Sequence, residues 1–152
     1  MLVPMIESCI QECGWNIGNV DRIAVTRGPG SFTGVRIGLA TARTLGLALK
    51  VPVLGFSTLA LMLDSAENKE NTLAVIDTKR DDFYAASTQK DDVTIMTLEQ
   101  VSEWSGTVIR DVLPDIALMA RQAAEITEGD IKRYDPSPIY VRDAETSTPK
   151  SA

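Results

Sequence analysis

One stretch of this chain, residues 25–49, constrains the fold more narrowly than any other: VTRGPGSFTGVRIGLATARTLGLAL. The overlapping RIAVT, at residues 22–26, has the alternation and the β-branched side chains of a short buried strand. After a glycine-rich turn, the apolar periodicity predicts a helix from about Thr33 to Leu49, with Ser31 or Thr33 as its N-cap. A strand, a glycine turn and a long helix in this order indicate an α/β or α+β domain.

The glycine-rich loop has two interpretations. Backbone N–H groups at a helix N-terminus, aided by the helix dipole, can bind a phosphate. The glycine spacing, however, fits neither G-x-x-x-x-G-K-[ST] nor G-x-G-x-x-G, so the motif evidence for a nucleotide is weak. The residues favour the second interpretation, in which the Gly-Pro-Gly turn positions the helix. The loop consists of Gly28, Pro29, Gly30, Ser31, Thr33 and Gly34.

A row of small residues runs along the helix that follows the loop. Gly34, Gly38, Ala42 and Gly46 recur every four residues and therefore lie along one helix face. Because glycine costs a helix interior about 1 kcal/mol relative to alanine, the row implies that another element packs closely on this face. That element is either this domain's own sheet or first helix, or a second polypeptide, and the pattern leaves both open.

The first segment, LVPMIESCIQECG, has the pattern of an amphipathic helix that ends at Gly14. Its two cysteines, four residues apart, are best explained as small apolar core or interface residues, with a redox pair as the alternative. The apolar stripe and the residues beside it are Leu2, Val3, Ile6, Cys9, Ile10 and Cys13.

Composition excludes several classes of function. Because the chain has no histidine, it has no Ser/His or Cys/His nucleophile pair and almost no means of forming a zinc site. A net charge of −6, without a dense basic run, argues against tight nucleic-acid binding by this chain alone. Neither a secretory signal nor a membrane-length apolar run is visible, so we expect a cytoplasmic protein without membrane contact.

Beyond the long helix, the pattern predicts a strand at residues 51–57, a helix capped by Ser57, a hairpin turning at RDD, a strand at residues 93–98 and a helix at residues 114–126. Two carboxylates near the hairpin suggest a rival function. Asp77 or Asp81, together with the glycine loop, could serve a hydrolase or a phosphotransferase that uses hydrated magnesium. Aspartate in such a place is more often a turn former.

The motifs GPGSFTGVRIGLATARTLGLAL, LVPMIESCIQECG, VIDTKRDDFYA and SPIYVRDAE resemble the TsaB (YeaZ) family of tRNA threonylcarbamoyladenosine biosynthesis. The resemblance implies the ASKHA, ribonuclease-H-like fold of the glycoprotease-like (peptidase M22-like) group. It also implies a non-catalytic subunit that pairs with the transferase TsaD, or with a second copy, and is joined by TsaE. The complex forms N6-threonylcarbamoyladenosine at position 37 of tRNAs that read ANN codons. This chain would contact tRNA only through the complex, and would bind no metal and no cofactor tightly, ATP or ADP belonging to the complex.

The resemblance also implies a partner interface on the first two helices. The family opens with strands that this chain does not show, so we expect an incomplete first lobe, a TsaB-like domain over residues 1–135, and a C-terminal strand and polar tail over residues 136–152. The alternative function is a glycoprotease-like or nucleotide-binding hydrolase that uses the glycine-rich loop. The expected interface residues are Leu2, Val3, Ile6, Cys9, Ile10, Cys13, Gly34, Val35, Gly38, Leu39 and Ala42.

Overall fold

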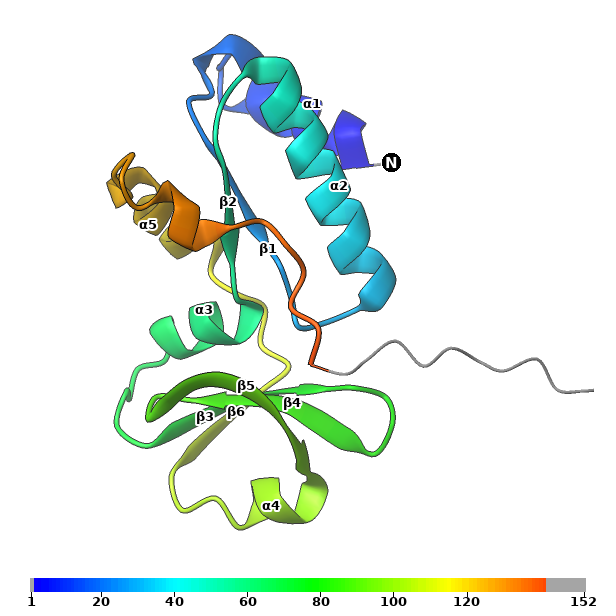
Figure 1. The fold of residues 1–152 in the computed structure, drawn as a ribbon, viewed down its shortest axis with the longest axis vertical. Coiled ribbons are helices and arrows are strands. Elements are labelled where there is room, and N and C mark those ends of the chain that lie inside the picture. Colours follow the sequence, from blue (N-terminus) through cyan, green and yellow to red (C-terminus); the bar gives the residue numbers. More distant parts are fainter. Residues whose placement is uncertain (1, 142–152) are drawn as a thin grey trace, which may run out of the picture.

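A computed structural model describes residues 2–141, which form two lobes, one above the other in Figure 1. Strands and helices alternate in the first lobe and strands cluster in the second, so the predicted mixed α/β class is confirmed. The first lobe contains α1 (Leu2–Glu12), η1 (Ile17–Asn19), β1 (Ile23–Thr26), α2 (Phe32–Leu49), β2 (Val53–Phe56), α5 (Ile116–Glu125) and η2 (Ile131–Tyr134). The second lobe contains α3 (Thr58–Asp64), β3 (Thr72–Asp77), β4 (Asp82–Ser87), β5 (Lys90–Thr97), α4 (Leu98–Ser102) and β6 (Thr107–Arg110).

The sheet of the first lobe has two strands within the described residues. β1 and β2 pair in parallel, from Ile23 opposite Val53 to Thr26 opposite Phe56. α2 covers one face of this sheet, while α5 and η2 cover the other. Because successive side chains of a strand point to opposite faces, Val53 faces α2 whereas Leu54 and Phe56 face α5. The apolar core on the α5 side consists of Leu54, Phe56, Leu61, Met119 and Ala123.

The second lobe is built on a four-stranded sheet in the order β5-β4-β3-β6. Its β3–β4 hairpin is the predicted one, and β6 joins the other edge of β3 in parallel. Side chains of α3 pack on one face of the sheet through Leu59 and Met62, and α4 packs on the other face through Val101. No helix within residues 2–141 is long and apolar enough to cross a lipid bilayer.

The C-terminal segment, residues 135–141, runs across the first lobe beside α2 (Figure 1). The expected strand is wrong for this described part of the tail: residues 136–141 form no strand, and one backbone hydrogen bond, from Ile139 N–H to Arg27 O at 2.9 Å, links them to the end of β1. Two arginines of α2 hold the segment through side-chain hydrogen bonds of 3.2 Å, Arg43 to Ser137 and Arg36 to Tyr140. The rest of the expected strand and tail, residues 142–152, lies outside the described residues.

Gly55 is the point at which this segment crosses β2. A Cβ at Gly55 would lie 2.7 Å from the backbone oxygen of Asp135 and 2.8 Å from the Cα of Pro136. We therefore expect Gly55→Ala to displace the segment and to lower the free energy of unfolding by about 1–3 kcal/mol, as overpacking does. Faster tryptic cleavage after Arg133 would measure the displacement.

Gly129→Ala is the matched control, because a Cβ there would meet only the Thr127 hydroxyl at 3.9 Å. Its stability and its rate of tryptic cleavage should equal those of the unmodified chain. Equal cleavage rates for both variants would show that the segment is not held at Gly55.

Candidate functional site

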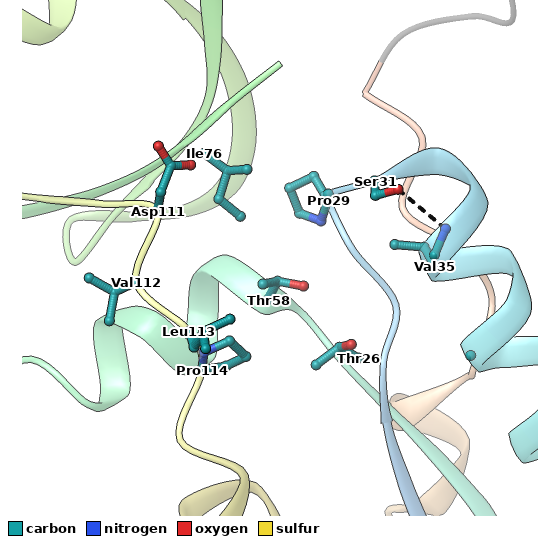
Figure 2. A pocket seen from close by; sticks show the side chains of 13 residues that line it. Thr26, Pro29, Ser31, Val35, Thr58, Ile76, Asp111, Val112, Leu113 and Pro114 are labelled. Carbon is teal, nitrogen blue, oxygen red and sulfur yellow. Dashed lines mark hydrogen bonds between the residues drawn. The ribbon is translucent and has the colours of Figure 1, made fainter. Parts of the chain in front are cut away.

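The glycine-rich loop leads from β1 into α2 and is anchored at both ends. Gly28 has a φ of +87°, a conformation that side-chain-bearing residues rarely adopt, and its carbonyl accepts a 2.9 Å hydrogen bond from Thr58 N–H at the start of α3. Ser31 is the N-cap: its Oγ accepts from Gly34 N–H at 3.3 Å, and its carbonyl accepts from Val35 N–H at 2.9 Å (Figure 2). The loop thus sets the direction in which α2 leaves the sheet.

A cleft of about 350 Å³ lies between this loop and the second lobe (Figure 2). Asp111 is the only charged residue among its described lining, and the Oδ1 atom of Asp111 accepts a 3.0 Å hydrogen bond from Asp77 N–H. A carboxylate opposes a phosphate group, and no lysine or arginine is among the described lining residues, so this lining does not favour the nucleotide interpretation of the loop. The lining residues are Thr26, Pro29, Gly30, Ser31, Gly34, Val35, Gly38, Thr58, Ile76, Asp111, Val112, Leu113 and Pro114.

The row of small residues in α2 faces this chain's own sheet, which was one of the two possibilities that the pattern left open. A Cβ at Gly38 would lie 4.0 Å from Val25 of β1, and a Cβ at Gly46 would overlap the side chain of Val53 of β2. Leu39 and Ala42 are only 3% and 6% exposed. The expectation that these two residues contact a partner is therefore corrected: the sheet of the first lobe already covers them.

The opposite side of α2 is open. Ile37 and Leu47 are 52% and 82% exposed, and a second row of small exposed residues, Ala40, Thr44 and Ala48, again four apart, lies on the same side of the helix. We call these five residues the outer face of α2. The sequence prediction missed this row because the glycines of the inner row were the stronger cue, although the spacing of Ala40, Thr44 and Ala48 carries the same signal.

α1 contributes a second open surface. No residue of α1 is buried, and the helix makes no extensive contact with any other described element. Leu2 and Val3 are exposed, whereas Ile6 and Ile10 are half-buried. Cys9, on α1, and Cys13, in the turn that follows it, are exposed free thiols, so a role in the core is wrong for them. The apolar stripe of α1 comprises Leu2, Val3, Ile6, Cys9, Ile10 and Cys13, as the sequence analysis has it.

Residues 1–127 match the family model described as TsaD: tRNA N6-adenosine threonylcarbamoyltransferase. The chain belongs to this family. Within it, the chain lies on the TsaB (YeaZ) branch, since it is 37% identical over 94 residues to the tRNA threonylcarbamoyladenosine biosynthesis protein TsaB of Escherichia coli. That match covers 60% of this chain and 41% of the relative, so the chain spans about two fifths of the length of the curated relative.

Two further relatives bear on the fold and on the partner. The structure of YeaZ from Pseudomonas aeruginosa aligns with a TM-score of 0.70 at 25% identity, covering 91% of this chain and 82% of that one. The ASKHA-type fold of the TsaB/YeaZ branch is thereby confirmed. A tRNA N6-adenosine threonylcarbamoyltransferase of Trichlorobacter lovleyi is 36% identical over 55 residues, which cover 36% of this chain and 16% of that enzyme.

Asp77, the carboxylate proposed for the alternative enzyme function, lies at the end of β3, where the β3–β4 hairpin turns. Its carboxylate accepts hydrogen bonds from the backbone N–H of Lys79 at 2.6 Å and from Lys79 Nζ at 3.0 Å. These two bonds lower the pKa of Asp77 below its usual value, and the bond from the backbone N–H has the larger effect. Asp81 adopts a φ of 62° in the same turn. The described residues include no cluster of three or more acidic or thiol ligands, and the geometry favours the turn-forming interpretation of both aspartates.

Lys79→Ala offers a test of that turn. The substitution removes the bond from Nζ but keeps the stronger backbone bond, so the pKa of Asp77 should rise yet stay below its usual value. A carbon-detected NMR titration of the Asp77 carboxyl group measures this. Because the pKa is depressed in the folded state, the bond supports folding above the pKa of the unfolded chain, and the support is lost as pH falls through the folded-state pKa. An unchanged titration would show that the side chain of Lys79 does not hold the carboxylate.

Proposed function

We propose that this chain is a non-catalytic scaffold subunit for the formation of N6-threonylcarbamoyladenosine at position 37 of tRNAs that read ANN codons. Its role is to bind the transferase TsaD through the outer face of α2 and the apolar stripe of α1. The single observation that carries the proposal is the open, apolar surface of these two helices. Soluble proteins rarely leave such a surface uncovered unless a partner uses it.

The outer face of α2 has the form of a helix-packing surface. Ala40, Thr44 and Ala48 present little more than backbone, so a partner helix can approach closely. Ile37 and Leu47, on the same side of the helix as this row, are the large apolar side chains that would enter the grooves of that partner. Helix ridges of one subunit would thus pack into helix grooves of the other.

The similarity of this chain to a transferase supports TsaD as the partner, because related subunits can pair through equivalent helices in a pseudo-symmetric interface. A homodimer would use the same surface. TsaE would join the pair, and the ATP or ADP that the reaction requires would be bound by the complex rather than tightly by this chain. Contact with tRNA would likewise come through the complex, as suits a chain with a net charge of −6.

Size-exclusion chromatography with light scattering, on the chain alone and mixed with the TsaD of the same organism, tests the proposal. A 1:1 complex that replaces a free monomer or homodimer is the expected result. A chain that remains separate from TsaD at micromolar concentrations would contradict the proposed function.

A further inference from the structure

A second cavity, of about 370 Å³, lies where four segments from both lobes meet. Arg27 enters it from the end of β1 and Ser57 from the start of α3. Asp92 belongs to β5, and Ile139 to the C-terminal segment. This cavity shares no lining residue with the cleft at the glycine-rich loop. Its lining is Arg27, Ser57, Asp92, Val93, Ile139, Tyr140 and Val141.

The guanidinium group of Arg27 is poorly satisfied by the chain itself. Its one hydrogen bond within residues 2–141 runs from NH1 to the backbone oxygen of Asp135 and is 3.4 Å long. Its Nε is buried and has no hydrogen-bond partner, and no described carboxylate forms an ion pair with it. A buried N–H that lacks an acceptor costs about 1–3 kcal/mol. Because Nε itself is closed to solvent, an acceptor from outside residues 2–141 would bind at the terminal N–H groups of the same cation, where NH1 makes only the long, exposed bond to Asp135.

The structure also holds Arg27 in place. Its backbone N–H donates to Phe56 O at 2.8 Å, and its carbonyl accepts from Ile139 N–H at 2.9 Å. Its Cδ lies 3.1 Å from the position that a Cβ of Gly55 would occupy, so the side-chain stem fills the space over that glycine. The backbone and the side-chain stem of Arg27 are therefore held in place at the wall of the cavity.

We propose that this cavity binds a small, singly charged carboxylate with a short apolar body, with Arg27 as its anchor. The planar guanidinium group can donate two parallel hydrogen bonds to a carboxylate. Val93, Ile139 and Val141 supply apolar walls for the rest of the ligand. Asp92 opposes a doubly charged phosphate, and the same carboxylate would attract the ammonium group of an α-amino acid. Plain carboxylic acids and α-amino acids would both bind Arg27 through their carboxylate, and only the amino acids would also bind Asp92 through their ammonium group.

Binding at this place would connect the two lobes. The ligand would touch β1 of the first lobe, β5 of the second and the C-terminal segment at once. A compound that binds the folded state alone raises stability with its concentration. The ligand should therefore stabilise the lobe arrangement and slow tryptic cleavage after Arg133, just before the C-terminal segment, with no effect on the outer face of α2.

The test uses the full chain with three probes, isobutyrate, valine and inorganic phosphate, at constant ionic strength. The Arg27 Nε–H resonance in a nitrogen–proton NMR spectrum and the melting temperature are followed as each probe is added. For isobutyrate or valine we expect a saturable shift of this resonance with a millimolar Kd, and binding of phosphate at least threefold weaker. Valine binding tighter than isobutyrate identifies an amino-acid site, and the reverse identifies a site for plain acids.

Three variants keep the proposal falsifiable. The variants are compared by the melting temperature, because the Arg27 resonance is absent from Arg27→Gln. Arg27→Gln should weaken isobutyrate binding at least tenfold, whereas Arg43→Gln, which also removes an arginine bound to the C-terminal segment, should not. Asp92→Asn leaves the anchor intact and should strengthen phosphate binding relative to isobutyrate. No saturable shift up to 100 mM (about 100 times a millimolar Kd), or equal binding by the Arg27→Gln and Arg43→Gln variants, would overturn the proposal.

Discussion

Replacing both Ile37 and Leu47 with aspartate is expected to raise the Kd of the complex with TsaD by at least 100-fold. Both side chains are exposed in the chain alone and would be buried in the proposed interface. A carboxylate buried there without a partner loses its hydration, and apolar anchors at the centre of an interface commonly contribute about 2 kcal/mol or more each. Two such losses correspond to a change in Kd of roughly 10²–10³. Isothermal titration calorimetry measures it directly.

The effect should be confined to binding. Because neither side chain is packed in the chain alone, the melting temperature of the double variant should stay close to that of the unmodified chain. Leu98→Asp is the matched control, since Leu98 is a similarly exposed leucine at the first position of α4 in the second lobe. Full affinity in the double variant would place the interface elsewhere, and equal loss in the control would indicate a general effect of added negative charge.

Features that depend on neighbouring residues were predictable from the sequence. Ser31 and Ser57 cap their helices as the local pattern indicates, and the β3–β4 hairpin turns where RDD stands. These structures follow from interactions within a few residues, namely side-chain oxygens that accept from backbone N–H groups and a chain reversal between two alternating segments. The helix expected at residues 114–126 begins two residues later, because Asp115 is the N-cap of α5 and Pro114 precedes it.

Features that depend on distant residues were not predictable from the sequence. β6 is a strand because β3 pairs with it, although its four residues are mostly exposed and lack an alternating pattern. The C-terminal segment was expected to be a strand but pairs at only one point, since side-chain bonds from α2 and the crossing at Gly55 fix its path. The side of the protein that the glycine row of α2 faces also depends on distant residues. Its spacing defines a face, and only the position of the sheet decides where that face points.

The glycine row itself gives the second large effect, a pair of substitutions with opposite signs. Helix propensity alone predicts that alanine in place of either glycine stabilises α2 by about 1 kcal/mol. At Gly38 the added Cβ would lie 4.0 Å from Val25, an ordinary van der Waals distance, so Gly38→Ala should raise the free energy of unfolding by about 0.5–1 kcal/mol. The melting temperature should then rise by about 1–4 °C.

At Gly46 the same change should destabilise the protein. The added Cβ would overlap the side chain of Val53 and lie 3.2 Å from the carbonyl oxygen of Val51, so α2 would have to move away from β2. We expect Gly46→Ala to lower the free energy of unfolding by about 2–3 kcal/mol, overpacking outweighing the gain in propensity. Thermal unfolding followed by circular dichroism measures both variants.

Whether Gly38→Ala and Gly46→Ala change the free energy of unfolding in the same or in opposite directions identifies the surface that packs on the glycine row of α2. If the glycine row faced a partner instead of the chain's own sheet, both alanines would stabilise the isolated chain and weaken the complex with TsaD. If the row faces the sheet, only Gly38→Ala stabilises the chain, and both variants bind TsaD as the unmodified chain does once folded. Restoring stability to Gly46→Ala with the smaller Val53→Ala would then locate the overlap at the contact between α2 and β2.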